Sequence, residues 1–154
     1  MRRGFTLLEL LIVIIIVGVM ATLGLSQYAQ VVERSRGAEA RQILGQIRSV
    51  CAAIYMEQEN TTRCVQNNGA ALGLGGATGT QIPNLACAPS HFFNYTVTQI
   101  NASAAGPRGV NLTAFRCIVG AGGKTPGAPG AQRQITLWAD YLTGQSDWIS
   151  PNGY

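Results

Sequence analysis

The chain has few of the side chains on which catalysis depends. His91 is its only histidine, and it stands beside Phe92 and Phe93, where a residue at the start of a sheet is a simpler interpretation than a general base. The acidic residues are Glu9, Glu33, Glu39, Glu57, Glu59, Asp140 and Asp147. No spacing among them is typical of a catalytic pair of carboxylates or of a calcium-binding loop. The composition therefore argues against an enzyme.

Charge is also scarce, and it is almost absent near the N-terminus. Only 12% of the residues are charged, and between Phe5 and Leu25 the sole ionisable side chain is Glu9. As a helix, the residues from Phe5 to Leu25 would span about 31 Å, close to the thickness of the hydrocarbon core of a bilayer. Arg2 and Arg3 precede this run, and positive residues stay on the cytoplasmic side of a membrane. We therefore expect the rest of the chain to lie outside the cytoplasm.

Glu9 does not fit a simple membrane anchor. A carboxylate at the centre of a membrane helix costs roughly 2.5 to 3.5 kcal/mol, and less near the helix end. A residue retained at such a cost usually has a charged partner, which predicts that the helix comes to lie among other helices rather than in lipid alone. A secretory signal peptide is a poorer explanation, because its apolar core would be shorter, on the order of 7 to 15 residues, and a small-residue cleavage site would follow it.

The first residues together resemble the N-terminal signature of the type IV pilins and of the related pseudopilins of type II secretion. The resemblance lies in a basic leader that ends in Gly4, the sequence Phe-Thr-Leu-Leu-Glu from Phe5 to Glu9, and an uninterrupted apolar run after it. It implies that a prepilin peptidase cuts between Gly4 and Phe5 and methylates the new amine of Phe5. It also implies that Glu9 pairs with the Phe5 amine of a neighbouring subunit, which would cancel two buried charges only after docking. The resemblance is much weaker beyond residue 55.

The composition indicates one small exported domain on this anchor. The chain has 154 residues, of which 47% are hydrophobic and 19 are glycine, so it can bury one modest core. Its formal charge is +4, and removal of the two leader arginines would leave +2, which is too little to support nucleic acid as a partner. The remaining arginines near the start are interpreted as a solvated helix face. They are Arg34, Arg36, Arg41 and Arg48.

An amphipathic helix is predicted to continue the membrane segment. Apolar residues recur with three- and four-residue spacing from Ala40 to Tyr55, and the pattern fades at Glu59. We therefore expect leader residues 1–4, a membrane or filament-core helix over 5–25, and its amphipathic continuation over 26–59, packed under a sheet.

The remaining residues, 60–154, are expected to form a loop followed by a small antiparallel sheet. Residues 60–79 are rich in glycine and have neither a helical nor a strand period. Strands rich in β-branched and aromatic residues are predicted at 92–100, 110–119, 134–142 and 146–149. Thr143 and Gly144 would turn the third strand into the fourth. The predicted fold class is therefore α+β and type IV pilin-like, with a long N-terminal helix packed on a small antiparallel sheet.

Four cysteines make an even set in a domain expected outside the cytoplasm. They are Cys51, Cys64, Cys87 and Cys117. Two disulfides are predicted, and three connectivities are open. A bridge between Cys51 and Cys64 is reachable, because the chain can fold back just after the helix ends. No C-x-x-C pair supports a metal site and no C-x-x-C-H supports attached haem, so we expect no cofactor.

We interpret the chain as the structural subunit of an extracellular type IV pilus. Its expected partners are copies of itself in a helical homopolymer, the prepilin peptidase and methyltransferase, an inner-membrane assembly platform, and the membrane before assembly. The precursor would lie in the inner membrane, and the assembled filament on a bacterial cell surface.

Two related functions stay open. A pseudopilin would form a short periplasmic filament that drives secretion, but many major pseudopilins have an acidic calcium-binding loop near the C-terminus, where residues 141–154 offer only Asp147. A minor pilin at the filament tip would instead use its C-terminal domain for adhesion. Its contact patch could then comprise Trp138, Tyr141, Trp148 and Tyr154. Core packing explains Trp138 equally well.

Overall fold

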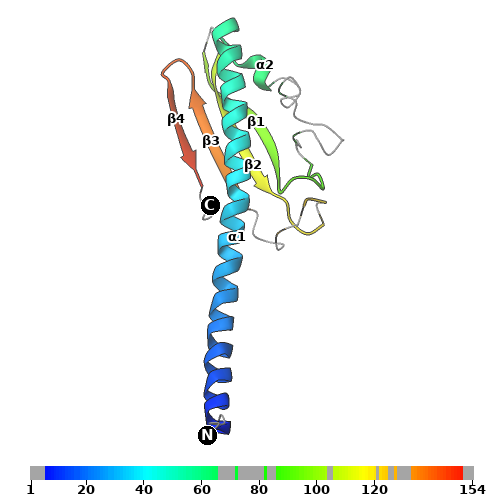
Figure 1. Cartoon of the computed structure of the whole chain (residues 1–154). Helices are drawn as coiled ribbons and strands as arrows, with labels where there is room; N and C mark the ends of the chain where they lie inside the picture. Colours follow the sequence, from blue (N-terminus) through cyan, green and yellow to red (C-terminus); the bar gives the residue numbers. More distant parts are fainter. Residues whose placement is uncertain are drawn as a thin grey trace. The chain divides into compact units, whose positions relative to one another are not determined.

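A long helix and a small sheet make up the protein. The computed structural model describes residues 6–65, 72, 82, 86–103, 106–120, 122–124, 127 and 133–150. Helix α1 (Leu7–Gln58) is followed by a short helix, α2 (Thr62–Val65), and by four strands (Figure 1). The strands are β1 (Phe93–Ser103), β2 (Gly106–Arg116), β3 (Gln134–Asp140) and β4 (Gln145–Ile149). The predicted α+β class, with its long N-terminal helix and antiparallel sheet, is confirmed.

Contacts divide the chain into two units. The first ends at Ser35 and contains only the N-terminal part of α1, whereas the second begins at Arg36 and contains the rest of that helix, α2 and the sheet. The two units bury their apolar residues in different ways.

In the first unit the apolar side chains are exposed on every side of the helix. Leu7 is 83% exposed, Ile15 56% and Met20 70%. Of the helices that the structure describes, α1 alone is long and apolar enough to cross a membrane. The hydroxyl of Thr22 donates a hydrogen bond to the carbonyl of Val19 at 2.8 Å, so this polar group is satisfied within the helix, as lipid requires.

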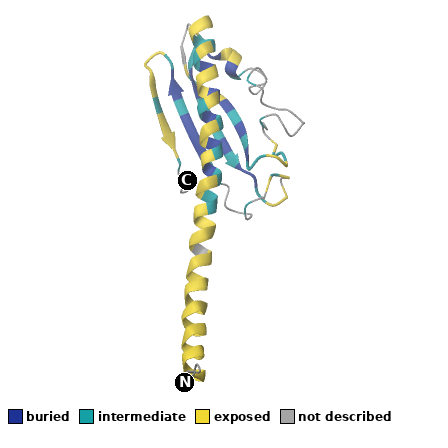
Figure 2. Ribbon diagram, in the orientation of Figure 1, coloured by how far each residue is buried: buried dark blue, intermediate teal, exposed yellow. Residues whose placement is uncertain are grey.

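In the second unit, one side of α1 packs on the sheet. Ala40, Leu44, Ile47 and Cys51 follow the three- and four-residue spacing of one helix face and are all buried. They form a single core with every second residue of the strands, including Tyr95, Val97, Leu112, Ile135 and Leu137. Figure 2 shows buried and half-buried positions alternating along much of β1 and β2, whereas most of β3 is buried. Burial of each large apolar side chain contributes about 1.5 to 3 kcal/mol.

The sheet is an antiparallel meander in the order β1-β2-β3-β4. Leu112 of β2 lies opposite both Val97 of β1 and Leu137 of β3, which places all three side chains on the helix-facing side. The opposite side has a polar row, in which the hydroxyls of Thr113 and Thr136 lie 3.3 Å apart. The predicted turn at Thr143 and Gly144 is present, and Gly144 supplies its positive φ of 73°.

Two predicted features of the second unit were wrong in detail. Residues 62–65 were expected in an aperiodic loop, but they form α2, whose first turn is closed by a hydrogen bond from the Cys64 N–H to the Thr61 carbonyl. Strand β2 begins at Gly106 and ends at Arg116, whereas the prediction ran from 110 to 119. Gly106 and Pro107 lower strand propensity, and their pairing with Ser103 and Ala102 of β1 overrides it.

Candidate assembly site

Thr6 and Glu9 form a reciprocal pair of hydrogen bonds at the start of α1. The Thr6 backbone N–H donates to Oε2 of Glu9 at 2.8 Å, and the Thr6 hydroxyl donates to the same oxygen at 2.9 Å. The Glu9 N–H donates in return to the Thr6 hydroxyl at 3.2 Å. This arrangement is a capping box, which satisfies helix N–H groups that have no partner in the preceding turn. The sequence Thr-x-x-Glu is the signature of such a cap, which was not among the predictions.

The capping box leaves the charge of Glu9 without a counter-charge among the described residues near it. Glu9 is exposed, and its neighbours along the helix are Leu8, 66% exposed, and Leu10, 62% exposed. Glu9 is the sole charged residue from Thr6 to Val32, a long and mostly apolar segment. A site of this kind suits one cationic partner supplied from outside the described chain.

The two residues predicted to be processed lie outside the described residues. Gly4 and Phe5 precede Thr6 directly, so the proposed cleavage between them, the methylation of Phe5 and the role of its amine stay predictions.

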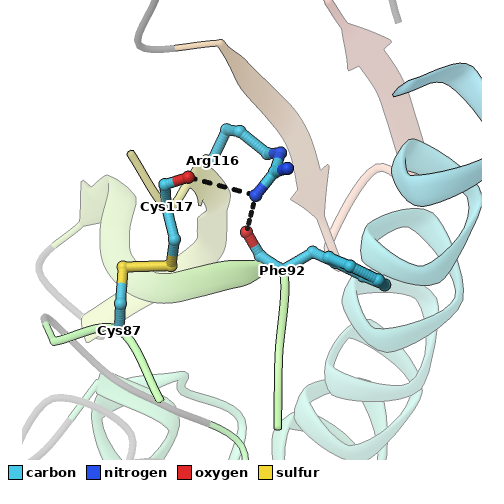
Figure 3. Close-up of a disulfide and its surroundings, with 4 residues drawn as sticks. All are labelled: Cys87, Phe92, Arg116 and Cys117. Carbon is cyan, nitrogen blue, oxygen red and sulfur yellow. Dashed lines mark hydrogen bonds between the residues drawn. A yellow bond between two sulfur atoms is a disulfide. The ribbon is translucent and has the colours of Figure 1, made fainter. Parts of the chain in front are cut away.

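Of the four cysteines, Cys87 and Cys117 form a disulfide with an S–S distance of 2.08 Å. Beside it lies Arg116, only 2% exposed, whose Nη1 donates to the carbonyls of Phe92 and Cys117, both at 3.0 Å (Figure 3). The Arg116 guanidinium also lies 5.6 Å from the ring centroid of Phe92. Arg116 thus connects Phe92, the residue before β1, to Cys117, the disulfide-bonded residue that directly follows β2.

Arg36 was predicted to lie on a solvated helix face, but it is half-buried. Its guanidinium lies 5.2 Å from the centroid of the Phe92 ring, and Lys124 lies 4.9 Å from the same ring. Cation–π contacts of this kind stabilise by about 0.5 to 1 kcal/mol at exposed sites. Arg36 therefore helps to attach α1 to the residue before β1, and Lys124 attaches the segment after β2 to the same ring.

Cys51 and Cys64 are free thiols, and both are fully buried. They are hydrogen-bonded to each other, and this bond together with burial raises the pKa of the Cys51 thiol. The predicted second disulfide therefore stays a prediction.

His91 lies against α1 rather than in a catalytic arrangement. Its Nδ1 is 3.6 Å from Oε1 of Glu39, and the buried hydroxyl of Tyr95 is near enough for the Glu39 charge to act on it. Burial and that charge raise the pKa of Tyr95. Within the described residues, no group of three His, Cys, Asp or Glu side chains is placed to hold a metal ion.

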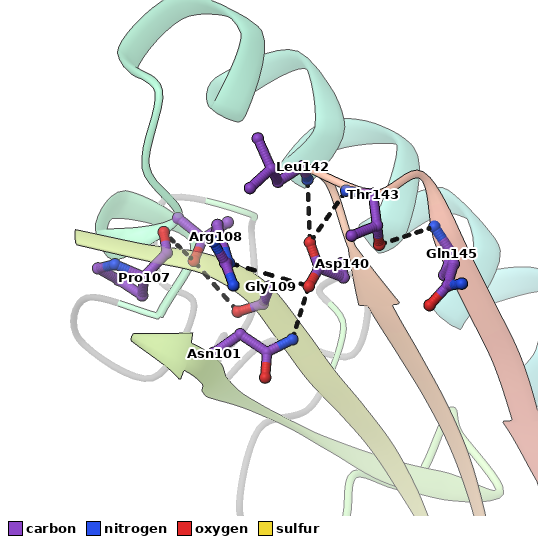
Figure 4. A network of polar contacts seen from close by, with 9 residues as sticks. Asn101, Pro107, Arg108, Gly109, Asp140, Leu142, Thr143 and Gln145 are labelled. Atoms are coloured by element: carbon purple, nitrogen blue, oxygen red, sulfur yellow. Dashed lines mark hydrogen bonds and ion pairs between the residues drawn. The ribbon is translucent and has the colours of Figure 1, made fainter. Parts of the chain in front are cut away.

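Asp140 organises the end of the sheet where β3 turns into β4. Its Oδ2 accepts from the side-chain amide of Asn101 at 2.6 Å, and its Oδ1 accepts from the N–H groups of Leu142 at 3.0 Å and Thr143 at 3.3 Å (Figure 4). Arg108 adds a positive charge 4.0 Å from Oδ2. The sequence analysis weighed Asp140 only as a catalytic candidate, whereas its contacts show a structural role.

The hydroxyl of Thr61 performs a similar role between α2 and the sheet. It is fully buried and donates toward the carbonyls of Pro107 at 3.1 Å and Gly109 at 3.2 Å. An open hollow of about 590 Å³ lies at this end of the sheet, bordered by Tyr55, Arg108 and Tyr141.

The aromatic residues considered for an adhesive patch do not share one surface. Trp138 pairs with Asp147, and Leu137 pairs with Trp148, so the two tryptophans point to opposite faces of the sheet. Tyr141 stacks on Tyr55 with ring centroids 5.6 Å apart, and Tyr154 lies outside the described residues.

Comparison with known proteins supports the resemblance carried by the N-terminal residues. Residues 1–25 match the family described as the prokaryotic N-terminal methylation motif. The chain is 30% identical over 64 residues to a type IV major fimbrial protein, FimA, of Dichelobacter nodosus, a match that covers 42% of this chain and 40% of that protein. It is 37% identical over 57 residues to the fimbrial protein EcpC of Eikenella corrodens, which covers 37% of each chain.

These matches are confined to part of each molecule. The chain spans about two fifths of the length of the curated relatives that it matches. No solved structure gives a significant match. The predicted resemblance to type IV pilins is confirmed, and the relatives are structural fimbrial proteins rather than enzymes.

Proposed function

We propose that this chain is a pilin, a structural subunit that polymerises into an extracellular type IV pilus with its N-terminal helices in the filament core. The observation that carries the proposal is Glu9, a lone carboxylate on a helix whose apolar side chains are exposed on all sides. Such a helix needs apolar surroundings, and its carboxylate needs a cation within them. A bundle of identical helices supplies both.

The proposed cation is the amine of Phe5 from a neighbouring subunit. Cleavage after Gly4 creates that amine, and its position four residues before Glu9 sets the axial offset between adjacent subunits. The capping box matters for the stage before docking, because Thr6 gives the carboxylate two hydrogen bonds while it has no ionic partner. Docking then adds the opposite charge.

The remaining steps follow from this proposal. A prepilin peptidase cuts and methylates the precursor in the inner membrane, an assembly platform extracts it, and the second unit faces the filament exterior. The relatives named as type IV fimbrial proteins favour a pilus over a pseudopilus. A tip adhesin has less support, since the two tryptophans of β3 and β4 lie on opposite faces.

Substitution of Glu9 and Thr6 separates charge pairing from helix capping. Glutamine can replace glutamate in a capping box, but it lacks the charge. We expect Glu9→Gln and Glu9→Ala to lower the yield of sheared surface filaments by about 100-fold or more, the scale of losing one partner from a buried ion pair. Thr6→Val removes the capping hydroxyl and keeps the carboxylate, so its yield should fall much less.

Glu57→Gln is the matched control, because Glu57 is exposed on the same helix but belongs to the second unit. Filament yield would be measured by immunoblot of sheared material, and processing by the intact mass of the membrane-bound chain. Normal filaments from Glu9→Gln together with a loss in Thr6→Val would show that Glu9 acts as a cap, and the charge-pair proposal would be wrong.

A further inference from the structure

Cys51 and Cys64 lie together where three elements of the second unit meet. Cys51 is on the buried side of α1, Cys64 is on α2, and both are fully buried within the core. Their thiols are hydrogen-bonded to each other, and Cys51 is also hydrogen-bonded to Tyr141, which follows β3. Two cysteines whose side chains interact within one core are placed on facing elements, as the partners of a disulfide must be.

The surroundings hold this pair in place. The Tyr141 hydroxyl donates to the Arg48 carbonyl at 3.1 Å, and the Tyr141 ring stacks on Tyr55, so the residue that follows β3 is fixed against α1. On the α2 side, the Thr61 N–H donates to the Pro107 carbonyl at 2.7 Å. Both helices are therefore attached to the sheet on either side of the two thiols.

We propose that Cys51 and Cys64 are a modification site, at which thiol–disulfide exchange with an external disulfide oxidant forms a second intrachain bond. The proposal rests on the export of the second unit, which is part of the proposed function. The new disulfide would join α1 to α2 covalently, between cysteines 13 positions apart in the sequence.

Two cysteine thiols and one disulfide oxidant account for all the electrons and protons of this exchange. One cysteine thiolate attacks a sulfur of the oxidant's disulfide and expels one oxidant thiolate, which takes up the proton that the cysteine released. The second cysteine then attacks the first at its sulfur and expels the other oxidant thiolate. Cys51 and Cys64 together lose two electrons and two protons, and the oxidant's disulfide becomes two thiols.

Burial fixes when this exchange takes place. Both sulfur atoms are fully buried, so an oxidant has no approach to either of them in the folded unit. The bond therefore forms while α2 is still docking onto α1. Once formed, it lies inside the core, where external thiols reach it only after unfolding.

The test is a peptide map of the full chain isolated from the native cell envelope and from sheared surface material. Free thiols are blocked with N-ethylmaleimide under denaturing conditions before digestion. Trypsin places Cys51 on residues 49–63, Cys64 and Cys87 on residues 64–108, and Cys117 on residues 117–124. We expect these three peptides to stay linked until a reductant is added, and chymotrypsin, which cuts after the leucines between Cys64 and Cys87, to yield separate 51–64 and 87–117 pairs.

Recovery of peptide 49–63 alone, with N-ethylmaleimide on Cys51, would overturn the proposal, as would a link from Cys51 to Cys87. A second measurement uses Cys87→Ala/Cys117→Ala, which keeps only the pair in question. Reduction of this variant should favour unfolding on the order of a hundredfold and lower its midpoint by about 10 °C, and no change would contradict the bond.

The map also separates this proposal from the proposed function. A chain that carries the 51–64 bond but is held in the envelope and never found in filaments supports the disulfide and refutes the pilus. A chain that is found in filaments with N-ethylmaleimide on both Cys51 and Cys64 supports the pilus and refutes the disulfide.

Discussion

Helix α1 serves two different environments along its length. Up to Ser35 its apolar side chains are exposed on every side, whereas from Arg36 one apolar side is buried under the sheet. The difference shows where each part has its packing partner. The second unit contains its own partner in β1 to β3, and the first unit has none among the described residues of the chain. In an isolated subunit the apolar residues of the second unit are therefore packed, whereas those of the first unit still lack packing partners among the described residues.

The acidic residues show the same contrast. Asp140 in the second unit is held by Asn101, Leu142, Thr143 and Arg108, all from its own chain. Among the described residues, the carboxylate of Glu9 in the first unit is hydrogen-bonded only to Thr6, in its own helical turn. A charge satisfied within the fold indicates a structural role, whereas Glu9 is left for the outside partner that we propose.

The largest expected difference between the two units is in the stability lost when one leucine of each is replaced by alanine. Leu44→Ala removes a fully buried side chain and should lower the free energy of unfolding of the second unit by about 2.7 to 5 kcal/mol. Leu11→Ala, at a position 46% exposed, should change it by less than about 0.5 kcal/mol. Denaturant unfolding of the detergent-solubilised chain, followed by tryptophan fluorescence, measures both. Equal losses would mean that the two units do not differ in this way.

A charge placed on each exposed surface should separate lipid-facing from water-facing residues. Ile15→Arg puts a guanidinium into the apolar segment and should disfavour membrane insertion by roughly 2.5 to 3.5 kcal/mol. Met56→Arg, at a position 84% exposed in the second unit, should cost less than about 1 kcal/mol. The comparison is read from the carbonate-resistant membrane fraction and from filament yield. Normal insertion of Ile15→Arg would remove the argument that this surface faces lipid.

Asp140→Asn should change how stability depends on pH. Burial alone would raise the pKa of Asp140, but hydrogen bonds from Thr143, Asn101 and Leu142 and the charge of Arg108 hold it below the usual value. Because the folded pKa lies below the unfolded value of about 4, the unfolded chain binds more protons in that range. The stabilisation is therefore present above about pH 4 and is lost as the pH falls through the folded pKa.

In the Asp140→Asn variant this contribution is missing, so we expect a loss of about 1.5 kcal/mol or more at pH 7 that shrinks toward pH 2. Denaturant midpoints of the two chains across this range test it. A difference that stays constant with pH would show that the carboxylate charge contributes nothing. No comparable change is expected for Glu57→Gln, since Glu57 is exposed.

Periodic features of the sequence predicted much of this structure. The spacing from Ala40 to Tyr55 predicted the helix face that packs on the sheet, and β-branched and aromatic runs predicted four strands within a few residues. These signals are local, because a helix face or a strand repeats along the chain. Helix α2 was missed, since Thr61 and Cys64 hold it through contacts with β2 and α1 that no local pattern reveals.

The residues of the candidate site also fall into those that a local sequence pattern predicts and those that depend on contacts between distant parts of the chain. Glu9 stands out in the sequence because a lone charge in an apolar run needs no structure to be noticed. The capping role of Thr6 is equally local, because Thr-x-x-Glu at the start of an apolar helix is by itself the signature of a capping box. The contact between Cys51 and Cys64, by contrast, depends on how α2 folds back, so the sequence left three pairings open.

The most direct test of the central claim is the intact mass of this polypeptide in surface material sheared from the native cell. The account predicts that the chain is a main component of that material, that it begins at Phe5, and that its N-terminal amine carries one methyl group. A chain that is absent from sheared filaments, or present there with its first four residues still attached, would contradict the account.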